Sequence, residues 1–322
     1  MLPGAQVSLL GQTAMLARLR QRVEAASCGA SASRSVGPTC YTAGPLLKNR
    51  LYLLAAAALW STAGAGLKLC GLSALQIAGG RSLIAGLFLL GAVREARRRP
   101  TRRMALATAA YAGTVILFVL ANKLTTAANA IFIQDTAPLW VLLFSAWLLR
   151  ERPGRAELLA IPVYGVGLAL FFLDELSPGR LAGNLVALAS GFTFALLIVG
   201  MRLAREDGPA ALVLGNLLAA LLALPFWSSG PEPRVIDLTI VAFLGVFQLG
   251  LAYVCFGRGI AHVPAFETSL LVLLEPVLNP IWTFLLAGER PGPWALVGGA
   301  VVLGATAWRT LASAFTAKGG RV

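Results

Sequence analysis

The chain has 322 residues, of which 57% are hydrophobic and only 13% charged, and its mean hydropathy is +0.76. Soluble domains carry about 25% charged residues, so this composition excludes an ordinary soluble protein. The formal net charge of +13 would suit nucleic acid, but the Arg residues lie between apolar blocks rather than along one soluble face. We therefore exclude a nucleic-acid partner.

Metal and cofactor sites have little support in this sequence. The four cysteines (Cys28, Cys40, Cys70 and Cys255) show no paired spacing, and His262 is the single histidine. Zinc and haem sites need clusters of such ligands. We expect no cofactor and no metal.

Residues 1–48 differ from the rest because they are rich in Ser, Ala, Gly and Arg. Their apolar segment 7–17 precedes Arg18, Arg20 and Arg22, which is the reverse of the order in a signal peptide. We interpret 1–48 as a disordered cytoplasmic tail.

The remainder divides into apolar blocks of the length that crosses a bilayer as a helix. Such long blocks with few charges are atypical of soluble helices. The sequence predicts ten transmembrane spans, at 51–68, 75–93, 104–122, 126–149, 157–173, 181–201, 209–228, 236–257, 265–287 and 293–311.

Positive charge gives the predicted orientation. Ten spans place both termini on one side, and 21 of the 27 Lys and Arg residues fall on that side. An excess of Lys and Arg marks cytoplasmic loops. We expect a multi-pass protein of the inner (cell) membrane with both termini in the cytoplasm.

An internal repeat appears when the chain is shifted by 138 residues. Pro138 then falls on Pro276, and Glu151–Gly154 (E-R-P-G) falls on Glu289–Gly292. The copies lie five spans apart, an odd number, so they face opposite sides of the membrane. The sequence therefore predicts an inverted-topology repeat, which is typical of alternating-access transporters; duplication without transport is the alternative.

The repeat divides the chain into four expected parts. These are the cytoplasmic tail 1–48, a first five-helix repeat 49–175, a second five-helix repeat 176–312 and a cytoplasmic tail 313–322. The expected fold class is an all-α membrane protein of ten transmembrane helices.

Each half also carries a distinctive set of motifs. They are N-K-L-T-T-A-A-N-A-I (122–131) leading into T-A-P-L-W (136–140), P-A-F-E-T-S-L (264–270) followed by L-E-P-V (274–277), and the two E-R-P-G turns. Together these motifs resemble the EamA-type transporters of the drug/metabolite transporter superfamily. The resemblance covers about 50–312. It implies a secondary carrier, often an exporter of amino acids and related metabolites, with a cavity lined mainly by spans one, three, four, six, eight and nine.

Two carboxylates lie near the middle of the membrane. Asp135 is about nine residues into span four and Glu275 about ten residues into span nine, and each is followed within three residues by Pro. Ionisable residues inside spans are costly and mark functional sites. We expect one or both to bind a cationic group or a proton; a structural carboxyl satisfied by a neighbouring helix is the alternative.

Other residues in the spans are weaker candidates. Arg81 in span two needs a partner, for which Asp135 is one option, and Glu267 could instead stabilise a helix N-terminus. Lys68 and Lys123 near the outer span ends could gate the outer mouth or extend to the interface. Further candidates for the substrate site are Trp60, Tyr111, Phe118, Gln134, Gln248, Tyr253 and Asn279.

These features predict a secondary active transporter that exports small metabolites by alternating access. Partners would be membrane lipid, a small-molecule substrate, protons as a coupling ion and a second copy in a homodimer. A sugar-phosphate or nucleotide-sugar antiporter of the same superfamily is the alternative, although few basic residues could face the cavity. The chain has no P-loop, H-E-x-x-H or G-x-S-x-G motif. We therefore expect no enzyme, with an intramembrane Asp135/Glu275 acid pair as a remote alternative.

Overall fold

The computed structural model describes residues 43–148, 155–173, 178–260, 262–263, 268 and 271–319. Contacts divide the chain into two units, Met1–Leu46 and Leu47–Val322. Apart from the first four residues of α2, every helix described belongs to the second unit. Most of the predicted tail 1–48 and the candidate Glu267 lie outside the described residues.

Within the described residues the chain is helical and forms no strand. The first half contains α2 (Ala43–Ser61), α3 (Ala63–Leu69), α4 (Ala74–Ala92), α5 (Ala105–Leu124), α6 (Ala127–Gln134), α7 (Ala137–Leu148) and α8 (Arg155–Leu173). The second half contains α9 (Pro178–Ala204), α10 (Gly208–Ala223), α11 (Val235–Phe243), the π-helix η5 (Leu244–Leu251), α12 (Ala252–Ile260), α14 (Leu274–Ala287) and α15 (Pro293–Gly319). Short 3-10 turns flank them: η1 (Arg94–Arg97), η2 (Arg102–Met104), η3 (Arg205–Asp207) and η4 (Leu224–Phe226).

The ten predicted spans fall on these helices, so the prediction of an all-α chain of two five-helix repeats is confirmed. Five described helices are long and apolar enough to cross a membrane: Ala74–Ala92, Arg102–Leu124, Arg180–Met201, Gly208–Phe226 and Val235–Ile260. Two shorter apolar helices are Leu158–Leu170 and Pro293–Trp308. Spans one and four divide into α2/α3 and α6/α7. α15 continues to Gly319, beyond the predicted span end at 311.

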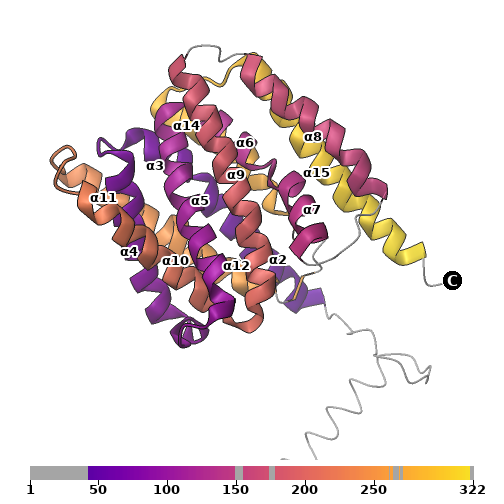
Figure 1. Cartoon of the computed structure of the whole chain (residues 1–322), viewed down its shortest axis with the longest axis horizontal. Helices are drawn as coiled ribbons and strands as arrows, with labels where there is room; N and C mark the ends of the chain where they lie inside the picture. The colour runs from indigo at the N-terminus through magenta and orange to yellow at the C-terminus, as the bar shows by residue number, and fades with distance from the viewer. Residues whose placement is uncertain are drawn as a thin grey trace, which may run out of the picture. The chain divides into compact units, whose positions relative to one another are not determined.

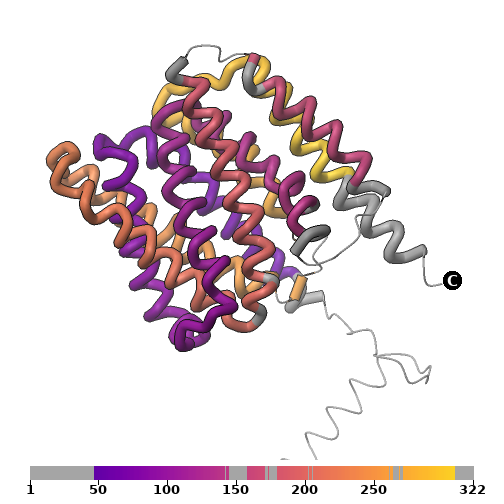
Figure 2. Tube along the Cα trace, in the orientation of Figure 1, coloured from indigo at the N-terminus to yellow at the C-terminus, as the bar shows by residue number. Residues whose placement is uncertain are grey.

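Helix packing joins the two halves. α8 lies along α15, α4 packs against α10, and α5 packs against α9; Figures 1 and 2 show α8 and α15 side by side although they are far apart in sequence. α3 of span one contacts α14 of span nine, and α6 and α7 of span four contact α9 of span six. Spans one and six hold equivalent positions in the two halves, and so do spans four and nine. Exchanging the halves therefore turns the first pairing into the second, as a repeat requires.

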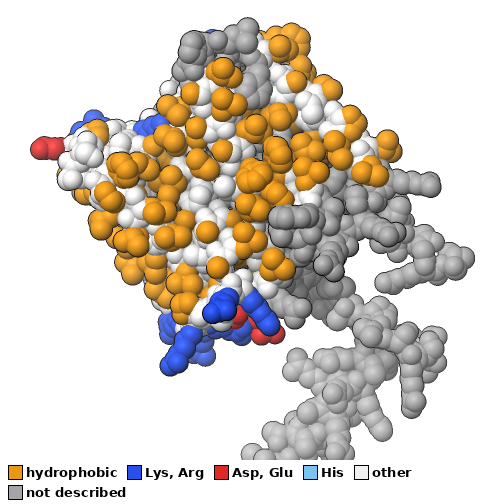
Figure 3. All heavy atoms as spheres, viewed as in Figure 1, with side chains coloured by type: hydrophobic (Ala, Val, Ile, Leu, Met, Phe, Trp, Pro, Cys, Tyr) orange, Lys and Arg blue, Asp and Glu red, His pale blue; other side chains and the backbone are white. Residues whose placement is uncertain are grey.

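The outer surface is apolar and part of the interior is polar. Large hydrophobic side chains are exposed on many helices, including Leu221, Leu285 and Leu296. On the face in Figure 3, orange hydrophobic side chains cover the middle, and charged side chains gather at two ends. Arg81 and Asn216 are buried. A bilayer explains this distribution, because lipid removes the penalty for exposing apolar side chains and leaves polar groups to be paired inside.

The two charged ends are separated by the length of α5. At one, the Arg98 end, Arg98 pairs with Glu206 and Asp207. At the other, the Lys68 end, Lys68 in the last turn of α3 pairs with Glu289. Lys123 in the last turn of α5 donates there to the carbonyl of Cys70 at 2.6 Å. Twenty helical residues span about 30 Å, the thickness of a bilayer core.

Candidate functional site

Interrupted helices mark the centre of the bundle. The fourth span breaks at Asp135 and Thr136, between α6 and α7, and a turn residue at Leu273 precedes α14 in the ninth span. Asp135 and Leu273 are equivalent under the 138-residue shift. Pro138 and Pro276 follow the two breaks, and each lacks the N–H that would continue the helix. Broken helices at equivalent positions of two repeats are typical of transporter binding sites.

The first span is also broken, at Thr62 between α2 and α3. The hydroxyls of Ser61 and Thr62 donate to the carbonyls of Ala58 and Leu59, both at 2.7 Å. The indole N–H of Trp282, on α14, donates to the Ser61 hydroxyl at 3.0 Å. The break is therefore joined to the ninth span.

Arg81 lies inside the bundle, only 2% exposed. Its guanidinium donates to Gln248 Oε1 and to the carbonyl of Val115, both at 3.3 Å. The suggested pairing of Arg81 with Asp135 is therefore wrong: the rotation of α4 directs the guanidinium toward α5 and η5. Gln248 lies on the π-helix, and such helices are frequent at functional sites. The Arg81 Nε is buried without a hydrogen-bond partner among the described residues.

Aromatic rings from three helices meet beside Arg81. The ring of Tyr253 lies 5.3 Å from that of Trp60 and 5.9 Å from that of Tyr111. Phe256 lies 5.1 Å from Trp60. Asn216 donates to the Tyr111 hydroxyl at 3.0 Å, which holds this ring in place. Edge and tilted contacts of this kind are favourable.

The two carboxylates belong to the same neighbourhood. Glu275 lies within electrostatic range of Asp135 and of Tyr253, and Tyr253 is also within range of Arg81. Oδ2 of Asp135 is buried and has no hydrogen-bond partner in the described part of the chain. We name the connected set the polar–aromatic cluster; it comprises Trp60, Arg81, Tyr111, Asp135, Gln248, Tyr253 and Glu275.

Other predicted residues lie outside this cluster. Gln134 donates to Ser190 Oγ at 2.7 Å on α9, and Phe118 packs in the apolar core. Asn279 is fully buried beside Gly64, and neither atom of its amide has a partner among the described residues. Lys68 and Lys123 both lie at the Lys68 end.

Three residues with clear contacts were not among the predicted site residues. Asn216 holds Tyr111, Trp282 holds the break at Ser61, and Glu289 pairs with Lys68. An amide in the middle of an apolar span was a usable signal for Asn216. Glu289 was predicted only to be part of the repeated E-R-P-G motif. A usable signal was present, because the second copy keeps this acid although it lacks the Arg residues that flank the first copy.

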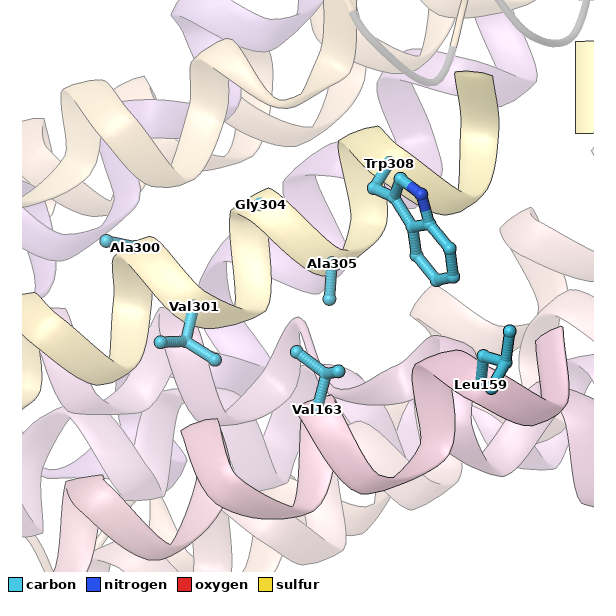
Figure 4. A pocket seen from close by; sticks show the side chains of 7 residues that line it. All are labelled: Leu159, Val163, Ala300, Val301, Gly304, Ala305 and Trp308. Carbon is cyan, nitrogen blue, oxygen red and sulfur yellow. The ribbon is translucent and has the colours of Figure 1, made fainter. Parts of the chain in front are cut away.

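A separate groove lies between α8 and α15, away from these charges. Its volume is ≈ 380 Å³, and its lining is apolar: Leu159, Val163, Ala300, Val301, Gly304, Ala305 and Trp308. Figure 4 shows Val163 and Val301 facing each other and the indole of Trp308 extending toward Leu159. An apolar lining suits lipid chains better than a polar metabolite.

Comparison with known proteins gives the family. The model of the EamA-like transporter family matches residues 48–173 and 181–310, once in each half. The chain belongs to the EamA-like transporter family. It is therefore a membrane transporter, whose partners are membrane lipid and a small-molecule substrate.

This EamA-family chain is similar to several known transporters. It is 25% identical over 203 residues to the threonine/homoserine exporter RhtA of Escherichia coli (strain K12), which is 62% of this chain and 68% of that protein. It is 28% identical over 270 residues to the uncharacterized transporter YwfM of Bacillus subtilis (strain 168), 79% and 90% of the two chains. It is 34% identical over 99 residues to a probable terminal-alkyne amino-acid exporter of Streptantibioticus cattleyicolor, 30% and 33% of the two chains.

A solved structure supports the fold. A protein chain solved by crystallography superposes with a TM-score of 0.59 at 23% identity, over 82% of this chain and 98% of that one. At this identity the similarity concerns the fold alone.

Proposed function

We propose that this EamA-family transporter exports small zwitterionic metabolites of the amino-acid class. The observation that carries the proposal is a pair of unsatisfied charged atoms in the polar–aromatic cluster. Arg81 Nε is a buried donor and Asp135 Oδ2 a buried acceptor, and neither has a partner among the described residues. Unpaired buried polar groups are costly, and a zwitterion supplies one group of each kind.

The two charged groups would bind different parts of the substrate. We call Arg81 the cationic pole, and Asp135 with Glu275 the carboxylate pole. Arg81 would bind the carboxylate through its free Nε–H, because guanidinium groups form strong charge-assisted hydrogen bonds with carboxylates. Asp135, with Glu275 nearby, would bind the ammonium group. Tyr253 is within electrostatic range of both Arg81 and Glu275, so the two charged groups belong to one neighbourhood. The ring faces of Trp60 and Tyr253 would hold the apolar part of the substrate.

The named relatives support this class of substrate. RhtA is a threonine/homoserine exporter, and the Streptantibioticus relative is a probable terminal-alkyne amino-acid exporter. Both names describe the export of amino acids. A sugar-phosphate or nucleotide-sugar antiporter is less well supported, because such anions need several cations and Arg81 is the one cation in the cluster.

Transport would proceed by alternating access between the repeats 49–175 and 176–312, in the inner membrane with both termini in the cytoplasm. The interrupted helices give each repeat a place to bend near the binding site. A proton on Asp135 or Glu275 would replace the ammonium group when the substrate leaves. This exchange would couple export to proton entry.

The test is transport by the full chain in proteoliposomes. A labelled panel of neutral, basic and acidic amino acids and one nucleotide sugar would be offered, with and without an imposed pH gradient, beside liposomes without protein. We expect saturable flux of neutral amino acids that the gradient accelerates. Flux of the nucleotide sugar alone would contradict the proposal and favour the antiporter function. Flux that is insensitive to the pH gradient would exclude proton coupling.

A further inference from the structure

Glu289 joins the two repeats at the Lys68 end. It lies in the turn between α14 and α15, in the second E-R-P-G motif. Its Oε2 pairs with Lys68 Nζ at 2.5 Å, and its Oε1 accepts from the backbone N–H of Ala127 at 2.6 Å. Lys68 Nζ also donates to the carbonyl of Thr125 at 2.7 Å. One carboxylate of the second repeat therefore connects α3 and α6 of the first.

The contact also holds the start of α6. Ala127 is the first residue of this helix, and its N–H is one of the four that a helix leaves unpaired. Thr126 satisfies another by accepting from the N–H of Asn129 at 3.1 Å. A carboxylate at a helix N-terminus is also favoured by the helix dipole. Glu289 therefore acts as an external cap supplied by the other repeat.

Close packing continues directly beneath this contact. Gly64 lies one turn before Lys68 on α3 and faces α14. A Cβ at position 64 would meet the amide oxygen of Asn279, Thr283 Oγ1 at 2.8 Å and Ala127 Cβ at 2.9 Å. The route from the Lys68 end toward the breaks is thus filled where α3, α6 and α14 meet.

We propose that Glu289 is the gating residue of the Lys68 end. With Lys68 and the Ala127 N–H it closes that end, and it must release both when the transporter opens there. Both partners of Glu289 in the described part of the chain lie in the opposite repeat, so relative movement of the repeats separates them. The charges are only partly exposed, with side chains 20% and 19% accessible for Lys68 and Glu289, so water replaces the lost contacts on opening at modest cost. This gate rests on the proposed alternating access, but not on the proposed substrate.

The test uses a cysteine placed beneath the gate. Thr283 is 1% exposed and contacts the Gly64 position, and Thr283→Cys nearly preserves its size. The parent carries this change with the native cysteines replaced by Ala: Cys28, Cys40, Cys70 and Cys255. A membrane-impermeant maleimide is added to right-side-out or inside-out vesicles, and labelling is timed.

We expect slow labelling of the parent from either side. Glu289→Gln keeps an oxygen for the Ala127 N–H but loses the ion pair, and it should accelerate labelling from the Lys68 end by about fivefold. The exchange Lys68→Glu with Glu289→Lys restores opposite charges but loses the acceptor for the Ala127 N–H and the donor to the Thr125 carbonyl, so it should return the rate only part of the way to that of the parent. Glu232→Gln is the matched control, because Glu232 is exposed in the loop 227–234 near the same end and should leave the rate unchanged.

Three outcomes would overturn the gate. They are an unchanged rate in Glu289→Gln, an equal rise in Glu232→Gln, and acceleration from both sides, which reports loosening of the whole fold. Because labelling needs no substrate, a wrong substrate class leaves this test intact. Conversely, if Glu289 does not act as a gate, the substrate specificity measured in proteoliposomes is unaffected.

Discussion

The indole N–H of Trp282 donates to the hydroxyl of Ser61 at 3.0 Å, directly beside the break between α2 and α3. Trp282 belongs to the second repeat and Ser61 to the first. The bond therefore links the interrupted first span to the ninth span, which carries Glu275. This cross-repeat bond complements the gate at Glu289, because it fixes the middle of α14 while Glu289 fixes its outer end.

Trp282→Phe should weaken this link. The substitution removes the donor but keeps an aromatic ring, so we expect a loss of about 1 kcal/mol in stability and a lower melting temperature in detergent. Ser61→Ala removes the acceptor side of the same bond, and the double variant should melt no lower than the worse single variant. Additive losses would show that the two side chains act independently.

Asp135→Asn and Glu275→Gln test the carboxylate pole. Both keep the size of the side chain and remove the charge that would bind an ammonium group or a proton. We expect transport of neutral amino acids to fall at least about tenfold in one of them, since a charge-assisted hydrogen bond is worth about 1.5–3 kcal/mol. Wild-type flux in both variants would show that neither carboxylate takes part in transport.

Arg81→Lys tests the opposite pole. Lysine keeps the positive charge, but its single ammonium nitrogen cannot reproduce the planar fork by which Arg81 reaches Gln248, Val115 and the substrate carboxylate from three nitrogens. We expect the KM for an amino acid to rise about tenfold, as for loss of one charge-assisted hydrogen bond. Inhibition by the corresponding amine without a carboxylate should change little. An equal loss for both compounds would give Arg81 a structural role through Gln248 and Val115.

The sequence predicted the fold better than the site. The apolar blocks have bilayer length, and the breaks near Pro138 and Pro276 follow from the missing N–H of proline. The break at Thr62 has no proline beside it; it depends on hydroxyl groups that bond to carbonyls of their own helix. Such competition is decided by the tertiary partner, here Trp282, which pattern alone does not reveal.

Contacts between helices were the harder part. Depth in the membrane follows from counting residues, so the mid-span placement of Asp135 and Glu275 agrees with the breaks. The rotation of each helix does not follow from counting, and this is why Arg81 faces Gln248 rather than Asp135. The π-helix adds to the difficulty, because η5 shifts the register at Gln248 where Gly245 lets α4 approach closely.

Gly64→Ala tests the packing beneath the gate. A new Cβ would meet Asn279, Thr283 and Ala127 at less than ordinary contact distance. We expect a loss of about 1–3 kcal/mol, as in overpacked cores, seen as a lower melting temperature. Gly304→Ala is the matched control, since nothing lies within 4 Å of the added carbon there. Equal melting of both variants would show that the neighbouring side chains accommodate the added carbon, so the packing beneath the gate is not tight.

Asp135→Asn should also change the gate, because α6 connects the two. This helix runs from Ala127, which Glu289 holds, to Gln134, next to Asp135. Its eight residues cover about 12 Å. A helix this short moves as one unit, so a shift at one end also moves the other. An unpaired buried carboxylate disfavours the described arrangement, and a neutral amide lowers that cost.

We therefore expect Asp135→Asn to slow maleimide labelling of Thr283→Cys from the Lys68 end by about threefold, a shift of under 1 kcal/mol. Ser190→Ala breaks the bond from Gln134 at the same end of α6 without touching Asp135, and it should leave the rate unchanged. If both variants label at the parent rate, α6 does not transmit the state of the site to the gate.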